Sequence, residues 1–159
     1  MRKGEEMRKI LCFLLIAGVL GCTGEKPADK GKSAQMWLET GMAQFQKRDY
    51  DAAIVSFTKA AEYEGPSAVS LNMLGMAYRF KYNQVRNKEL KDKEIAAFQK
   101  AIEVDPNYWV ALMNLGATYY FLGEKAKAVP LFKKALEINP QHPEKEQLLR
   151  LIAEEERKG

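Results

Sequence analysis

The sequence predicts an all-α fold, a solenoid of three stacked helix pairs closed by a C-terminal capping helix. The main observation is a repeat, because Gly41, Gly75 and Gly116 are separated by 34 and then 41 residues. Phe57, Phe98 and Phe132 are separated by 41 and then 34 residues, and Ala60, Ala101 and Ala135 follow the same steps. The chain therefore has a period of 34 and one insertion of seven residues, which lies between Gly75 and Phe98. Such a period is typical of stacked supersecondary units.

The residues around these markers fix the type of unit. The third copy reads Leu112-x2-Leu115-Gly116-x2-Tyr119, then Ala128-x3-Phe132, Ala135 and Pro140. The second copy reads Leu71-x2-Leu74-Gly75-x2-Tyr78, then Phe98, Ala101 and Pro106, and the first reads Trp37-x3-Gly41, Ala53-x3-Phe57, Ala60 and Pro66. This pattern resembles the tetratricopeptide repeat, a helix–turn–helix unit of about 34 residues. The resemblance implies a right-handed solenoid with repeats at 33–67, 68–108 and 109–142.

The residues that the copies share have a physical role in such a unit. Leu at i and i+3 with Tyr at i+7 forms one apolar helix face. A glycine in that face lets the paired helix approach closely, and proline after Asp105 or Asn139 ends the second helix. The copies also depart from the family pattern: Thr40 replaces Leu, Gln44 replaces Tyr, Pro66 comes one residue late, and Glu94 stands where a small Ala is expected.

The segment 143–159 begins with a proline at a helix-start position and carries Leu148, Leu149 and Ile152 as a short apolar stripe. We expect a polar helix that caps the solenoid. A helix that binds a partner is the alternative.

The insertion, at about 80–93, has a basic bias. Its cations are Arg79, Lys81, Arg86, Lys88, Lys91 and Lys93, and its anions are Glu89, Asp92 and Glu94. One interpretation is two extra helical turns with a solvated surface. The other is a projecting basic element that contacts acidic lipid headgroups or an acidic partner.

The first 21 residues are predicted to be a secretory signal peptide. Four basic residues within positions 2–9 precede an apolar run at 10–20, which ends in Gly21-Cys22. The run would be about 18 Å long as a helix, too short for a hydrocarbon core of about 30 Å. Translation from Met7 would give an even more conventional signal, so the start codon stays open between Met1 and Met7.

Val19-Leu20-Gly21-Cys22 resembles a bacterial lipobox. The resemblance implies that Cys22 is lipidated after cleavage of the signal, with 22–32 as a polar tether to a periplasm-facing membrane surface. Thr23 in place of Asp favours the outer membrane over the inner one, by the same analogy. An ordinary signal with an incidental cysteine is the alternative.

The first helices of such repeats line a concave groove, and we expect their outward residues to bind a partner. These residues are Leu38, Met42, Phe45, Val69, Asn72, Met76, Arg79, Phe80, Val110, Met113, Asn114, Ala117, Tyr120 and Phe121. Three of them are Met, which suits adaptable binding surfaces. Chaperone-tail-binding members of the family use a clamp of Lys, Arg and Asn here, but this chain has mostly Leu, Met and Val, so a peptide with apolar anchors is expected. Some of these side chains could instead be core between repeats.

No catalytic constellation is present in the sequence. The chain has one histidine, His142, and no phosphate-binding loop, so the sequence predicts no cofactor, metal site or small-molecule substrate. The formal charge is +4, and 21 − 19 = +2 after residues 1–21 are removed, which does not indicate nucleic-acid binding. The resulting hypothesis is a non-enzymatic, lipid-anchored adaptor that binds a protein of a bacterial envelope. The alternative is a fixed structural subunit or a pilotin-like assembly factor of an envelope, pilus or secretion complex.

Overall fold

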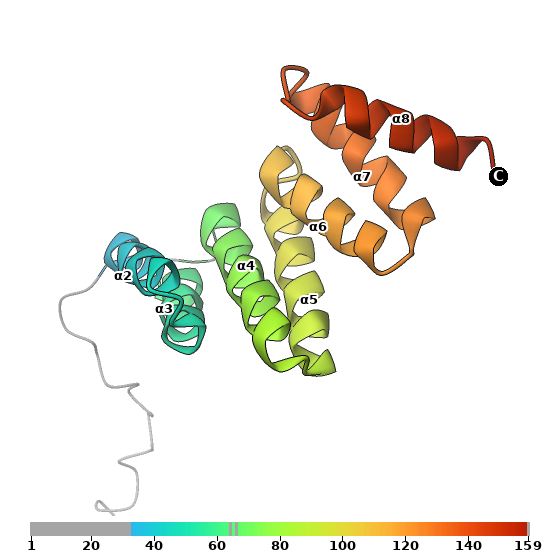
Figure 1. Ribbon diagram of the computed structural model, residues 1–159. Helices are drawn as coiled ribbons and strands as arrows, with labels where there is room; N and C mark the ends of the chain where they lie inside the picture. Colours follow the sequence, from blue (N-terminus) through green and yellow to red (C-terminus); the bar gives the residue numbers. More distant parts are fainter. Residues whose placement is uncertain (1–32, 64, 66, 159) are drawn as a thin grey trace, which may run out of the picture. The chain divides into compact units, whose positions relative to one another are not determined.

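The computed structural model describes residues 33–63, 65 and 67–158, which form seven α-helices and no strand. The helices are α2 (Ala34–Gln46), α3 (Tyr50–Tyr63), α4 (Ala68–Val85), α5 (Lys88–Val104), α6 (Trp109–Phe121), α7 (Lys125–Ile138) and α8 (Lys145–Glu156). Consecutive helices pair as α2 with α3, α4 with α5 and α6 with α7, and each pair stacks on the next (Figure 1). The all-α repeat fold is therefore confirmed. The predicted signal peptide, Cys22, the tether and Pro66 lie outside the described residues.

One contact holds each helix pair together, between a glycine of the first helix and a phenylalanine of the second. A Cβ atom built on Gly41, Gly75 or Gly116 would lie 2.6 Å from a ring carbon of Phe57, Phe98 or Phe132, respectively. Carbon atoms do not approach so closely, so only glycine allows the ring to lie against the backbone. All three rings are almost completely buried. The recurring Gly-to-Phe spacing in the sequence thus corresponds to a repeated physical contact.

Small residues join one pair to the next. Ala61 on α3, Ala68 and Leu71 on α4, Ala101 on α5 and Ala111 on α6 form one buried cluster. Alanine side chains keep neighbouring helix axes close and leave little room for side-chain rearrangement. Small side chains therefore allow each pair to pack closely on the next.

Side chains cap the starts of four helices. The Ser33 hydroxyl accepts a hydrogen bond from Met36 N, and Ser67 accepts one from Ser70 N at 3.1 Å. Asp49 accepts from Ala52 N, and Asn87 from Glu89 N, at 3.1 and 3.0 Å. Such caps satisfy amide groups that the helix itself leaves unbonded.

The seven-residue insertion lengthens both helices of the second pair. Helix α4 has 18 residues where α2 and α6 have 13, and α5 has 17 where α3 and α7 have 14. The connection within the second pair has two residues, at 86–87, where the other pairs have three, at 47–49 and 122–124. The five residues gained in α4 and the three gained in α5, less the one lost from the connection, account for the seven of the insertion. Arg86 ends α4 in the left-handed region, with φ of 55°, and its N–H donates to Tyr82 O at 2.7 Å. The insertion is thus a longer helical hairpin with extra turns, as the first interpretation expected.

Helix α8 packs on α7. Leu148 and Ile152 are buried against Ala128, Phe132 and Leu136, and the helix is mostly exposed elsewhere. Leu149, which the sequence placed in the same apolar stripe, is instead 43% exposed. It follows Leu148 by one residue, or about 100° around the helix, which turns it away from α7.

Candidate functional site

The first helices α2, α4 and α6 lie in series along the array (Figure 1) and contact one another in turn. Side chains at equivalent positions on them are therefore expected to share one side. Relative to the packing glycine of each helix, positions −6, +1 and +5 lie within about 40° of one another. We call the apolar residues at these positions the apolar stripe: Met42; Val69, Met76 and Phe80; and Val110, Ala117 and Phe121. The other two positions, both on α2, hold Gln35 and Gln46. Four side chains of the stripe are exposed: Met42 and Val69 are each 43% exposed, Phe80 is 36% exposed and Phe121 is 85% exposed.

Other residues predicted to face the groove pack inside the array. Leu38 and Phe45 lie against the core of the first pair, and Met113 and Tyr120 lie against the cluster that joins α7 and α8. Phe45 meets Phe80 edge-on, with ring centroids 5.1 Å apart. For these side chains, the alternative of a core between repeats describes the structure better.

Tyr50 completes an aromatic cluster between the first two pairs. Its ring centroid lies 5.3 Å from that of Phe45 and 5.5 Å from that of Phe80. The Tyr50 ring is edge-on to Phe45 and tilted to Phe80, and aromatic rings that meet edge-to-face at this separation attract one another beyond their burial. Phe80 therefore has one side in this cluster and another exposed to solvent.

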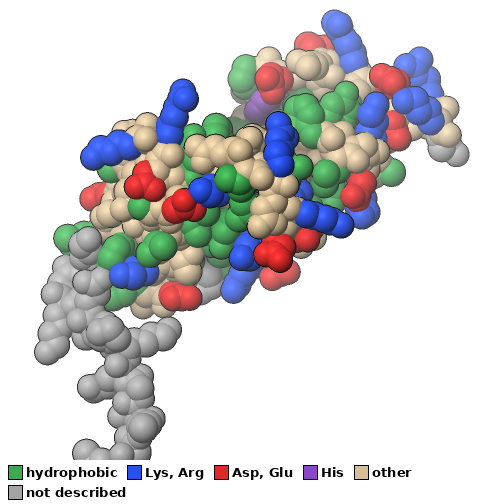
Figure 2. Space-filling view, turned by 60° about the horizontal axis from the view of Figure 1, so that its bottom comes forward, with side chains coloured by type: hydrophobic (Ala, Val, Ile, Leu, Met, Phe, Trp, Pro, Cys, Tyr) green, Lys and Arg blue, Asp and Glu red, His purple; other side chains and the backbone are tan. Residues whose placement is uncertain are grey.

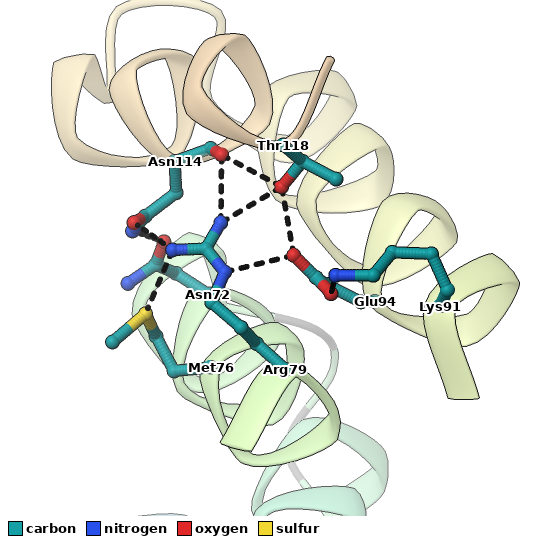
Figure 3. Close-up of polar contacts among 7 residues, drawn as sticks. All are labelled: Asn72, Met76, Arg79, Lys91, Glu94, Asn114 and Thr118. Carbon is teal, nitrogen blue, oxygen red and sulfur yellow. Dashed lines mark hydrogen bonds and ion pairs between the residues drawn. The ribbon is translucent and has the colours of Figure 1, made fainter. Parts of the chain in front are cut away.

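A buried polar network occupies the boundary between the second and third pairs (Figure 3). Its centre is Glu94 on α5, whose side chain is fully buried. Arg79 Nε on α4 donates to Glu94 Oε1 at 2.8 Å, and the Thr118 hydroxyl on α6 donates to the same oxygen at 2.7 Å. Lys91 forms an ion pair with the other oxygen, Oε2. A buried carboxylate is tolerated only with such partners, and both oxygens here have them.

Arg79 extends this network to α6. Its Nη1 donates to Asn114 Oδ1 at 3.1 Å, and its Nη2 donates to Asn114 O and to Thr118 Oγ1, both at 2.8 Å. The guanidinium also lies 4.9 Å from the centre of the Phe98 ring. One side chain thus links the first helices of two repeats and covers the glycine–phenylalanine contact of the second pair.

Three residues assigned to the groove consequently have internal roles. Asn72 is only 4% exposed, and its Oδ1 accepts from Asn114 Nδ2 at 2.9 Å. Arg79 bonds to Asn114 and to Glu94, and Asn114 bonds to Arg79 and to Asn72. The expectation that Asn72 points outward is wrong, because its amide is paired across the α4–α6 boundary. Arg79 and Asn114 are partly exposed but already satisfied.

Sequence reasoning noticed Glu94 as a departure but not its partners. Positions 53 and 128, which correspond to it in the other repeats, hold Ala, and both are fully buried. A carboxylate in a buried position needs a cation, and Arg79 precedes it by 15 residues on the adjacent helix. The combination of Glu94 at a buried position with Arg79 on the adjacent helix was therefore the signal from which the ion pair could have been predicted.

Potential metal ligands are not clustered in the part of the chain that the structure describes. No group of three or more His, Cys, Asp or Glu residues there could hold a metal ion. His142 lies edge-on to Trp109, with ring centroids 5.6 Å apart. Burial raises the pKa of Tyr78, and the hydrogen bond from Lys158 is the main cause that lowers the pKa of the exposed Glu154. Within the same described residues, no helix combines the length and apolar character needed to cross a bilayer.

Charges are mixed on the surface. Figure 2 shows Lys and Arg side chains interspersed with Asp and Glu, with apolar side chains between them. A pocket of about 580 Å³ lies between Tyr120 on α6 and helix α8, with both acidic and basic residues in its walls. The main apolar feature of the predicted groove remains the stripe on the first helices.

Comparison with known proteins identifies the repeats. Two family models described as tetratricopeptide repeat match residues 28–69 and 109–142. A curated relative, "Protein bimA" of Emericella nidulans, is 28% identical over 110 residues and covers 69% of this chain. The chain spans only 13% of the length of that protein.

Solved structures agree with this assignment. The crystal structure of MamA has a TM-score of 0.65 and 26% identity, covering 77% of this chain and 68% of that one. The first TPR of Spaghetti (RPAP3), bound to the HSP90 peptide SRMEEVD, has a TM-score of 0.67 over 77% of this chain and 94% of that one. Its identity is 22%, so it shows the fold alone. The described part of the chain is therefore a helical solenoid built of tetratricopeptide repeats.

Proposed function

We propose that this chain is a lipid-anchored adaptor of a bacterial cell envelope, which binds a segment of a partner protein along the apolar stripe. The observation that carries the proposal is the exposure of Val69, Phe80 and Phe121 on successive first helices. Large apolar side chains cost free energy in water, and a row of them usually marks an interaction surface.

The chemistry of the stripe defines the kind of partner. The polar groups nearest to it, on Asn72, Arg79 and Asn114, are satisfied by one another. A ligand therefore gains little from hydrogen bonds at these residues and gains more by placing apolar side chains against the stripe. A related fold, that of RPAP3, has been solved with a bound peptide, which supports a peptide or helix as the ligand class.

Capture of the partner tests the binding surface. The tagged full chain and a Val69→Glu, Phe121→Glu variant are compared in affinity capture from gently solubilised envelopes. We expect the wild type to retain one defined envelope protein and the variant to lose it, because a carboxylate on the stripe would be desolvated on binding.

A matched control is available on the second helices. Val55 on α3 and Val104 on α5 are 56% and 43% exposed, so a Val55→Glu, Val104→Glu variant carries the same charge change away from the stripe. Circular dichroism verifies that both variants fold. If the control loses the partner and the stripe variant keeps it, the proposal is wrong.

The lipid anchor is tested separately at Cys22. We expect mass spectrometry of the mature protein to find an acylated Cys22 at the amino terminus, and Cys22→Ser to release the protein from the membrane fraction. An unmodified Cys22 in a membrane-bound protein would refute the anchor and leave the adaptor proposal standing.

A further inference from the structure

The longer hairpin of the second repeat creates a pocket of about 290 Å³ beside the end of α6. Its walls include Tyr82, Arg86, Lys91, Glu94, Thr118 and Phe121. Tyr82 and Arg86 belong to the extra turn and the connection that the insertion supplies. The shorter hairpins α2–α3 and α6–α7 lack these residues, so the pocket is particular to this repeat.

The pocket has an excess of positive charge. Arg79, Arg86 and Lys91 line it together with a single carboxylate, Glu94, so 3 − 1 = +2. Arg79 and Lys91 already bind Glu94. A carboxylate that two cations share leaves one positive charge uncompensated at the pocket floor.

Arg86 is the cation available to a ligand. Arg86 is exposed, and its guanidinium lies 5.6 Å from the centre of the Tyr82 ring. Among the described residues, no carboxylate forms an ion pair with it. Its planar group can bind a carboxylate through two parallel hydrogen bonds.

The other wall of the pocket is apolar. Phe121, the most exposed large hydrophobic residue among those described, lies at this pocket, and Leu122 beside it is 43% exposed. Phe121 is also the last residue of the apolar stripe. A segment bound along the stripe would therefore bring its next side chain to Arg86.

We propose that this pocket binds an acidic side chain that adjoins an apolar residue in the partner segment. The inference rests on the proposed function, and it adds a specificity-determining residue, Arg86, which the first helices do not supply. The exposed cations Lys88 and Lys93 alternate with Glu89 and Asp92 along α5. This balance disfavours an extended polyanionic surface such as a membrane and favours one localised carboxylate.

Peptides of defined sequence test the proposal. Fluorescein-labelled peptides of about 12 residues carry two Leu and one Glu in varied order, each beside an otherwise identical peptide with Gln in place of Glu. Fluorescence anisotropy with the intact chain is expected to give at least one Glu peptide that binds about 10-fold more tightly than its Gln counterpart. Arg86→Gln should remove this preference and leave the affinity for the Gln peptide unchanged.

Lys93→Gln is the matched control, since it removes the same charge from an exposed site on α5 that does not line the pocket. It should keep the preference for Glu. Equal binding of Glu and Gln peptides, or a preference that survives Arg86→Gln, would overturn the inference while the stripe could still bind peptides. Arg86-dependent binding to phosphatidylglycerol vesicles, with no preference among peptides, would overturn it in favour of a lipid headgroup. If no peptide binds at all, the inference fails, and partner capture with the stripe variants decides the proposed function independently.

Discussion

The second repeat and its neighbours use the same packing contact but differ at one buried position. All three pairs place a phenylalanine ring against a glycine backbone. One helical turn before that ring, the first and third repeats have Ala53 and Ala128, whereas the second has the buried Glu94. The glycine–phenylalanine contact is common to all three pairs, whereas the contacts of Glu94 and Arg79 join the second pair to the third. A repeat can therefore keep its fold while a single substitution changes how it is tied to its neighbour.

The largest effect is expected from loss of the shared contact. Phe98→Ala and Phe132→Ala should each lower the free energy of unfolding by about 3–5 kcal/mol, because each removes a buried ring and leaves a cavity. Chemical denaturation measures both. Val104→Ala, at an exposed site on α5, is the control and should change stability by less than about 0.5 kcal/mol. If Phe98→Ala is tolerated and Phe132→Ala is not, the shared contact does not support both repeats.

The next largest loss of stability is expected from disruption of the Arg79–Glu94 network, which only the second of the three repeats has. Arg79→Met should cost about 3 kcal/mol, since it leaves the buried Glu94 with only Lys91 and Thr118 as partners. The double change Arg79→Met, Glu94→Ala removes both charges and restores the small residue of the other repeats. We expect it to recover most of the loss in urea denaturation. A double variant as unstable as the single one would show that the network is not the source of the cost.

A smaller effect is expected at the glycines. Gly75→Ala places a methyl group 2.6 Å from the Phe98 ring, and the resulting strain of about 1–3 kcal/mol exceeds the gain of about 1 kcal/mol in helix propensity. The thermal midpoint should fall by similar amounts for Gly41→Ala, Gly75→Ala and Gly116→Ala. A rise in the midpoint for any of them would mean that its ring moves freely.

The smallest effect is a dependence on alkaline pH at Tyr78. Burial raises the pKa of this phenol above its ordinary value of 10.0. Its contribution to stability is thus fully present below pH 10 and is lost as pH rises through the folded-state pKa. Tyr78→Phe should make the fall of the thermal midpoint above pH 10 shallower and leave it unchanged near pH 7. An identical alkaline profile in both proteins would contradict this.

Much of the fold could be predicted from the sequence because its determinants are local and repeated. The spacing from glycine to phenylalanine, and alanines such as Ala60 and Ala101, specify the helix pairs and their stacking. The length of the insertion followed from the same spacing. Its division between α4 and α5 did not, because capping by Asn87 and the left-handed turn at Arg86 decide where the hairpin reverses.

The candidate site was less predictable, because a helical position specifies a direction and not a partner. Val69, Phe80 and Phe121 are exposed as expected. Asn72 occupies an equivalent side of its helix, yet it pairs with Asn114 on the next one. Such a pairing depends on two residues 42 positions apart and on the distance between their helices. A pattern within one repeat contains no information about it.

The polar network also has a consequence for the order in which we expect parts of the solenoid to open to solvent. Each helix pair contacts only its neighbours, so an array of this kind opens from its ends through partly unfolded states. Arg79 spans the second and third pairs and ties α4, α5 and α6 into one cooperative block. Amide hydrogens in this block should exchange with solvent most slowly, while α2 and α8 fray. A partner that binds the α2 end of the stripe would then suppress the fraying of α2, and binding would be detected as slower amide exchange in that helix.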